Sequence, residues 1–348
     1  MSEYYKNRLS DLSVNIKDLT HCPNKDINPE EVEIVSKYII NEYMGLKLYD
    51  LYGEKQVIYV AGLSTRYALH NLKNIKKNVI EVAKTFGLWL SLVWVTDGIF
   101  DGVKNKDKEV YREMIISMIE DGKYTPRFNH QENNEDTIFD ELIIAYQHIY
   151  RLYLTRVSNY NKHSVRMIEI WLVRYIKSLD YNDVNNLLGF RKWRLDSGAI
   201  MCVIWHNIMF RDTGFSINRI DETFFEDVSL VVSYHNDVLS YSRDTKDGTP
   251  NVITLIKNNV TNVSELSVIK YGIHLTDGYY KKLVVYSDLL REEILETGLT
   301  VLEGSYNWTN KEKRYASGLK MLKKLLRGSI HVRKGSGLPT AGDPVINH

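Results

Sequence analysis

Apolar residues recur at helical spacing along most of the chain. In residues 162–178, for example, Ile168, Trp171 and Tyr175 fall on one helical face. The same spacing predicts helices at 71–101, 103–120, 135–157 and 217–243, two pieces within 182–211 that meet near Ser197–Gly198, and further helices near 283–297 and 310–327. Because no segment alternates apolar and polar residues as a strand does, the pattern predicts an all-α protein of about ten helices.

Local signals mark where two of these helices begin. Residues 28–31, Asn-Pro-Glu-Glu, combine an N-cap, a first-turn proline and acidic side chains at the positive end of the helix dipole. The helix that follows is expected to end at Gly45. Residues 262–265, Asn-Val-Ser-Glu, resemble a capping box that would open a later helix.

The most apolar segment lies within 71–101, which is predicted to be one long helix. It is amphipathic at first and apolar on all sides later, so we expect it to be deeply buried. Its apolar stretch, residues 86–100, is too short to span a bilayer and contains Asp97. We therefore expect a core helix whose end meets a polar group, and no membrane insertion.

Composition narrows the class of protein. The 45 Lys and Arg nearly balance the 44 Asp and Glu, which excludes a general attraction to nucleic acid or anionic membranes. Two cysteines, Cys22 and Cys202, cannot build a disulfide scaffold or a cysteine-rich zinc site, and they fit a reducing compartment, so a cytoplasmic location is expected. No linker divides residues 1–332, so one domain is expected there. Residues 333–348 have little apolar content and are predicted to be a disordered tail.

Two polar clusters interrupt otherwise apolar helices. Asp97 and Asp101 are four residues apart and share one helical face; hard carboxylate oxygens there suit Mg²⁺, although an ordinary solvated acid pair has the same spacing. Asn236, Ser240 and Asp244 form a stripe about 12 Å long that could chelate one hard cation. Asp237 points off this stripe and is predicted to be a surface acid.

Taken together, these clusters resemble the two metal-binding motifs of microbial class I terpene synthases, DDxxD (or DDxxxD) and NDxxSxxxE. The segment 308–315 is similar to the family's W-x5-RY motif, and 194–198 resembles its pyrophosphate-sensing arginine followed by a helix break. The sequence departs from the pattern at Gly98, where a second Asp is usual, and at Asp244, where Glu is usual. Arg194 is the favoured sensor, and Arg191 is the rival.

The resemblance implies a single-domain helical bundle around a central active-site cavity. It implies three Mg²⁺ ions, with Mn²⁺ as the alternative, held by Asp97 on one rim and by Asn236, Ser240 and Asp244 on the other, with Asp101 as a further candidate. It assigns diphosphate binding to Arg194, Arg243, Arg314 and Tyr315, and it places the helix break at Ser197 and Gly198. Aromatic side chains that could line the cavity are Phe86, Trp89, Trp94, Phe100, Trp171 and Trp308.

The substrate implied is a linear isoprenyl diphosphate, and farnesyl diphosphate suits a single domain of this size best. The expected reaction is ionisation and cyclisation to a sesquiterpene with release of pyrophosphate, by a protein that could be a homodimer. A geranylgeranyl diphosphate-using diterpene synthase and a chain-elongating prenyl diphosphate synthase share the fold, but an elongase resembles two full DDxxD motifs. The residue Gly98 also leaves open an inactive binding or scaffold protein. Residues 304–307 read as a loop, so Arg314 and Tyr315 after it are predicted to close over the bound diphosphate.

Overall fold

The computed structural model describes residues 2–18, 27–44, 46, 53–72, 75, 78–102, 105–122, 134–179, 186–211, 216–311 and 315. Within these ranges the chain forms thirteen helices and no strand, which confirms the all-α prediction. They are α1 (Ser2–Asp18), α2 (Pro29–Met44), α4 (Glu54–Asn71), α5 (Val79–Gly102), α6 (Asn105–Asp121), α7 (Asn134–Val157), α8 (Lys162–Ser178), α9 (Leu187–Ser197), α10 (Ile200–Arg211), α11 (Arg219–Asp247), α12 (Val252–Asn259), α13 (Glu265–Tyr286) and α14 (Glu292–Lys311).

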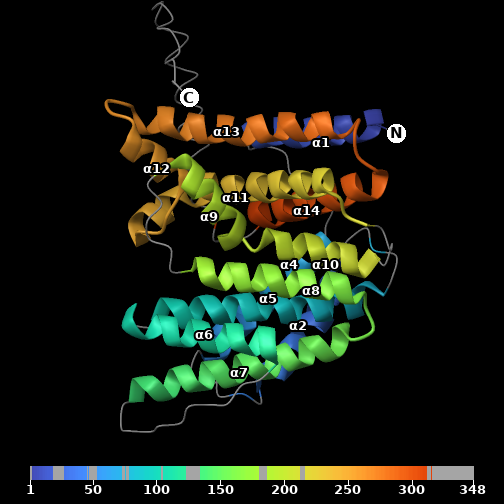
Figure 1. Ribbon diagram of the computed structural model, residues 1–348, viewed down its shortest axis with the longest axis vertical. Coiled ribbons are helices and arrows are strands. Elements are labelled where there is room, and N and C mark those ends of the chain that lie inside the picture. Colours follow the sequence, from blue (N-terminus) through green and yellow to red (C-terminus); the bar gives the residue numbers. More distant parts are fainter. Residues whose placement is uncertain are drawn as a thin grey trace, which may run out of the picture.

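The helices stack as a bundle from α1 and α13 at one end to α6 and α7 at the other (Figure 1). Helix α11 packs on α13 and α14, while α5 packs between α4 and α7. The helices between these two ends (α4, α5, α8, α9, α10, α11 and α14) surround the cavity described below.

Several predicted boundaries are confirmed, and side-chain caps explain them. Helix α8 runs over the predicted 162–178, and the side chain of Asn161 accepts hydrogen bonds from the first-turn amides of His163 and Ser164. Helix α11 begins in a capping box between Asn218 and Asp221 and continues one turn beyond the predicted end, to Gly248 in the left-handed conformation (φ 70°). The longer helix carries the whole predicted ligand stripe on one continuous backbone.

The single helix predicted over 71–101 is wrong, because the structure divides that segment into α4 and α5. Helix α5 begins only at Val79, where the side-chain oxygen of Asn78 accepts a hydrogen bond from the Glu81 amide at 3.4 Å. Apolar periodicity does not reveal the break, because Leu72 and Ile75 in the connection are buried as helix residues would be. Asn78 was the local signal for it.

The helix predicted near 283–297 also straddles a real boundary, where α13 ends at Tyr286 and α14 begins at Glu292. The cap of α13 is Ser264, which accepts from the Ser267 amide, and Asn262 lies before it with φ 61°. The predicted capping box on Asn262 is therefore wrong, although the helix itself is present. Helices α1, α4 and α12 were not predicted.

Residues 304–307 are not a loop, because they lie inside α14. A Cβ on Gly304 would come within 2.8 Å of the Asn71 side chain and 2.9 Å of the His70 carbonyl oxygen. This glycine therefore permits close packing of α14 against α4, which is a different use of glycine from a turn. The predicted lid loses its loop, and Arg314, the 316–327 part of the predicted last helix and the tail lie outside the described residues.

Helix α5 is the predicted core helix. Among the described helices it alone contains a stretch long and apolar enough to cross a membrane, Val79–Asp97, and 67% of that stretch is buried inside the protein. Phe86, Leu88 and Trp89 have no exposed surface. This burial is what a core helix requires, and it brings Asp97 near the end of α5 to an internal surface.

Candidate active site

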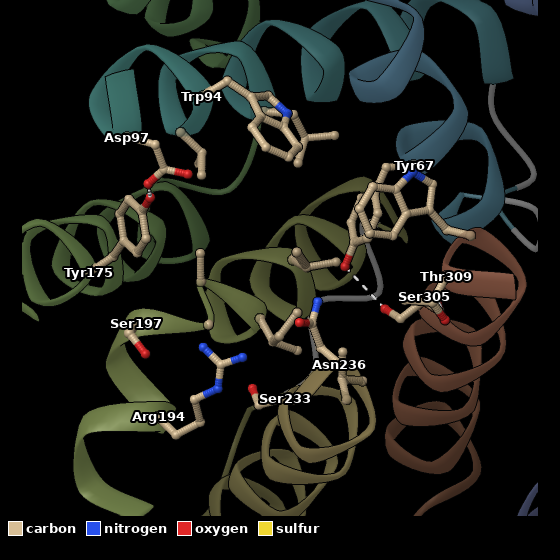
Figure 2. A pocket seen from close by; sticks show the side chains of 18 of the residues that line it. Tyr67, Trp94, Asp97, Tyr175, Arg194, Ser197, Ser233, Asn236, Ser305 and Thr309 are labelled. Carbon is tan, nitrogen blue, oxygen red and sulfur yellow. Dashed lines mark hydrogen bonds between the residues drawn. The ribbon is translucent and has the colours of Figure 1, made fainter. Parts of the chain in front are cut away.

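A cavity of about 250 Å³ lies at the centre of the bundle. Its apolar wall is formed mainly by indole rings and aliphatic side chains, namely Trp89, Trp94, Trp308, Val93, Val203 and Val232. The polar side chains of the sequence motifs enter it from three helices: Asp97 from α5, Arg194 and Ser197 from α9, and Asn236 from α11 (Figure 2). The motifs singled out in the sequence therefore meet at one cavity although they are far apart along the chain.

Asp97 occupies the α5 side of the cavity, across from Asn236 (Figure 2). Its carboxylate accepts a hydrogen bond from the hydroxyl of Tyr175 on α8. Tyr175 thereby fixes the orientation of the carboxylate, and this partner on another helix could not be predicted from the sequence. Asp101 lies one turn later in α5, but its side chain is outside the described part of the chain.

The predicted stripe on α11 is a connected set of oxygen atoms. Ser240 Oγ donates to Asp244 Oδ2 at 2.5 Å and lies 3.4 Å from Asn236 Oδ1. Asn236 lines the cavity, whereas Ser240 and Asp244 are buried beside it with 2% and 5% of their surface exposed. The amide, hydroxyl and carboxylate oxygens are thus within reach of a single cation.

The surface-acid prediction for Asp237 is wrong. Asp237 is fully buried, and Arg194 Nη2 donates a hydrogen bond to its Oδ1 at 2.6 Å. Burial raises the pKa of Asp237 to about 7, against the opposing effect of Arg194 and of the Val252 amide. On α11, position 237 faces α9 and α12, and these neighbours could not be read from the sequence of α11 alone.

Asn251 connects this ion pair with the stripe. Its side-chain Nδ2 donates to the Asp237 carbonyl oxygen at 2.8 Å and to Asp244 Oδ2 at 2.9 Å, and its Oδ1 accepts from the Ile253 amide to cap α12. Asn251 is 1% exposed. One buried side chain therefore holds both the partner of Arg194 and the last residue of the stripe.

Of the two candidate sensor arginines, Arg194 lines the cavity and Arg191 does not. The Arg191 guanidinium lies 3.8 Å from Asp227 and over the ring of Tyr279, on another face of α9. The guanidinium of Arg194 points between Ser197 and Ser233 toward the cavity (Figure 2).

The predicted break after Arg194 is present between α9 and α10. A Cβ on Gly198 would lie 2.6 Å from Ser233 Oγ and 3.1 Å from the Arg194 carbonyl oxygen, so the glycine permits close packing of α9 against α11 without a shift of these atoms. The next residue, Ala199, has φ 52°, which is uncommon for a residue with a side chain. The break brings Ser197, Gly198 and Ala199 to the cavity wall.

Three buried polar atoms on this wall have no hydrogen-bond partner among the described residues: Arg194 Nε, Ser197 Oγ and Ser233 Oγ. Buried donors without partners are costly, and a ligand that accepts hydrogen bonds would satisfy them. Their grouping around a guanidinium suits an anionic, oxygen-rich ligand such as a phosphate group.

Two further candidates for diphosphate binding, Tyr315 and Arg243, lie beside the stripe. Tyr315 is 1% exposed, and its hydroxyl accepts a hydrogen bond from Asn236 Nδ2 at 2.8 Å. Arg243 pairs with Asp244 at 3.0 Å, and its guanidinium lies 5.8 Å from the centre of the Tyr315 ring. Arg314 lies outside the described residues.

Three of the six candidate wall aromatics, Trp89, Trp94 and Trp308, line the cavity, and the other three do not. Phe86 is turned into the core, where it stacks on His206 at 4.7 Å. Trp171 lies under the Arg174 guanidinium at 3.8 Å, and Phe100 is 3% exposed in the core. Helical spacing alone does not distinguish these two environments, since both are apolar.

The donor set fits a hard divalent cation. No cluster of three His, Cys, Asp or Glu side chains occurs within the described ranges, so a transition-metal site of that kind is not found there. The oxygens of Asn236, Ser240 and Asp244, with Asp97 across the cavity, are instead the ligand types that Mg²⁺ prefers.

No protein-family model matches the chain, and no curated protein matches its sequence. Solved structures do match its fold. The 2-methylisoborneol synthase from Streptomyces coelicolor A3(2), in complex with Mg²⁺ and geranyl-S-thiolodiphosphate, aligns over 85% of this chain and 96% of its own, with 12% identity and a TM-score of 0.63. Germacradien-4-ol synthase from Streptomyces citricolor aligns over 84% and 99%, with 11% identity and a TM-score of 0.60.

An a-eudesmol synthase covers 83% of this chain and 97% of its own, with 14% identity and a TM-score of 0.57. At such identities the likeness establishes the fold alone. The chain has the all-α fold of the microbial class I terpene synthases, a helical bundle around a central cavity, as the sequence motifs predicted.

Proposed function

We propose that this chain, which has the fold of class I terpene synthases, is a Mg²⁺-dependent enzyme that ionises farnesyl diphosphate and cyclises the resulting carbocation to a sesquiterpene. The observation that carries the proposal is the convergence of Asp97, Arg194 and Asn236, the first residue of the α11 stripe, on one cavity with an indole-rich wall. The same fold supports many chemistries, so these side chains, and not the fold, indicate the reaction.

The polar end of the cavity would bind the diphosphate. The guanidinium of Arg194, with its unpaired Nε, can donate two hydrogen bonds to phosphate oxygens, and Ser197 and Ser233 can donate one each. Tyr315 and Arg243 lie next to the stripe and would add donors from the other side. Arg314 remains a candidate from the sequence motif.

Asn236, Ser240 and Asp244 would hold Mg²⁺ on one rim and Asp97 on the other. When bound, the metal neutralises the charge that develops on the leaving diphosphate. Asp97 is oriented for this by Tyr175, and Asp244 by Asn251 and Arg243.

The apolar end of the cavity would hold the isoprenyl chain and then the cation. The ring faces of Trp89, Trp94 and Trp308 stabilise positive charge through their quadrupole without acting as strong nucleophiles. The surrounding aliphatic side chains keep bulk water away from the cation.

Incubation with the C10, C15 and C20 isoprenyl diphosphates, Mg²⁺ and a hydrocarbon-trapping overlay tests the proposal. A cyclase yields volatile terpenes, with the highest turnover expected for the C15 substrate. An elongase yields longer diphosphates when isopentenyl diphosphate is added, and a scaffold yields neither. Preference for the C20 substrate would identify a diterpene synthase and overturn the choice of farnesyl diphosphate.

A further inference from the structure

Three hydroxyl groups form a polar patch on the otherwise apolar side of the cavity. Tyr67 comes from α4, and Ser305 and Thr309 come from successive turns of α14. The Tyr67 hydroxyl and Ser305 Oγ are 3.0 Å apart, and both groups face the cavity away from Asp97 and Arg194 (Figure 2). Exposure is 8% for Tyr67 and 3% for each of the other two, so bulk water does not reach them freely.

A count of hydrogens shows that the patch can bind one more polar group. Two hydroxyls that pair with each other use one hydrogen, so the Tyr67–Ser305 pair keeps a second one, which it can donate to a bound molecule or to the adjacent Asn71 side chain. Thr309 Oγ1 directs its own hydrogen to the carbonyl oxygens of Ser305 and Tyr306, both at 3.0 Å, and keeps its lone pairs as acceptors. A buried water needs two to four polar partners, roughly what the patch offers.

The neighbours of the patch are mainly aromatic rings and aliphatic side chains. Trp308 packs against the Tyr67 ring with its plane nearly perpendicular, at 5.1 Å between centroids, and the wall beyond is indole and aliphatic. A water on the patch would therefore lie beside the space proposed for the hydrocarbon, on the other side of the cavity from Asp97 and Arg194, with Trp308 in contact with both Tyr67 and Tyr315.

We propose that the Tyr67–Ser305–Thr309 patch binds one water molecule and directs it onto a carbocation, so that the enzyme releases a terpene alcohol. This inference rests on the proposed function. The water oxygen donates a lone pair to the cationic carbon and forms a C–O bond. The resulting oxonium loses one proton to the pyrophosphate released into the same cavity, and the three hydroxyls are unchanged.

Product analysis in H₂¹⁸O tests the inference. With farnesyl diphosphate and Mg²⁺, the main product of the wild-type protein should be an alcohol carrying one ¹⁸O atom. Attack of water on phosphorus, as by a contaminating phosphatase, leaves the original oxygen on carbon, so the label reports attack on carbon.

Removal of the hydroxyls should change the product class. In Tyr67→Phe, in Ser305→Ala and most strongly in the double variant, the ratio of labelled alcohol to hydrocarbon should fall about tenfold or more. Tyr146→Phe and Ser91→Ala remove buried hydroxyls that do not line the cavity, and they should keep the wild-type ratio.

The outcomes separate the two proposals. Hydrocarbon as the main wild-type product, or an unchanged ratio in the folded patch variants, overturns the water site and leaves the terpene synthase assignment intact. If the double variant does not fold, the wild-type label and the single variants still decide. No turnover of any isoprenyl diphosphate by the wild-type protein overturns both.

Discussion

Arg194 and Asp237 form a buried ion pair, with 2.6 Å between Nη2 and Oδ1, at the wall of the cavity. Only 14% of the arginine side chain and none of the aspartate is exposed. The pair holds the guanidinium in place before any ligand arrives and leaves its Nε available toward the cavity. Asp237 is therefore a positioning residue for the proposed diphosphate site.

Replacing Asp237 should lower turnover by more than the accompanying loss of stability explains. In Asp237→Asn the arginine loses its anionic partner, so we expect a loss of stability on the order of 3 kcal/mol and a fall in turnover of at least about tenfold per folded molecule. Asp227→Asn is the matched control, because Asp227 is also fully buried on α11 and pairs with Lys282 away from the cavity. Urea unfolding and turnover per folded molecule, measured on both, separate the effects. Equal turnover losses would contradict the positioning role.

The α11 stripe should carry the metal dependence. Asp244→Ala or Asn236→Ala removes a hard oxygen ligand, so turnover should fall by about 10²-fold or more while the helical circular dichroism is retained. Independently of turnover, Mg²⁺ with inorganic pyrophosphate should raise the melting temperature of the wild-type protein and not that of Asp244→Ala.

The control for this prediction is Asp247→Ala, since Asp247 ends the same helix but is exposed. It should behave as the wild-type protein does in both measurements. A rise in melting temperature in Asp244→Ala equal to that of the wild-type protein would show that the metal binds elsewhere.

Asn251 should matter through Asp244 and Asp237, without contact to the ligand. Serine also caps helices well, but it lacks the Nδ2 group that donates to the Asp237 carbonyl oxygen and to Asp244 Oδ2. Asn251→Ser should therefore raise the Mg²⁺ concentration needed for half-maximal turnover several-fold. Asn218→Ser makes the same change at the cap of α11, and its Mg²⁺ dependence should stay that of the wild-type protein. Identical Mg²⁺ titrations for the two variants would reduce Asn251 to a helix cap.

These residues show what the sequence could and could not supply. The helices 29–44 and 162–178 were predictable because each has its own cap and apolar face. The stripe was predictable because its spacing lies within one helix. Asp237, Tyr175 and Asn251 were missed or misread because their roles depend on neighbours from other helices. The division between α4 and α5 was missed because buried Leu72 and Ile75 continue the apolar pattern across it.

The buried histidines of the core indicate that stability depends on pH. His206 is fully buried, donates from Nδ1 to the Cys202 carbonyl oxygen at 2.7 Å and accepts from the Tyr153 hydroxyl at 2.9 Å. Burial lowers the pKa of His206 to about 3 from its ordinary 6.5. The unfolded chain therefore binds a proton more readily, and the free energy of unfolding should fall as the pH drops below 6.5, by up to about 1.4 kcal/mol per pH unit.

His235, whose pKa burial lowers to about 4, adds a slope of the same sign. His206→Gln can keep one donor and one acceptor without titrating, so it should remove roughly half of the slope between pH 6.5 and pH 5 in urea unfolding of the metal-free protein. His148→Gln, at an exposed position, is the comparison. An unchanged slope in His206→Gln would mean that other groups set the acid stability.

The most direct test of the central claim uses farnesyl diphosphate as the only organic substrate and counts both products. We predict one pyrophosphate released for each volatile C15 molecule formed, with both signals abolished by a chelator and restored by Mg²⁺. Arg194→Gln should lose both signals together. No pyrophosphate release, or release only after isopentenyl diphosphate is added, would contradict the assignment as a terpene synthase.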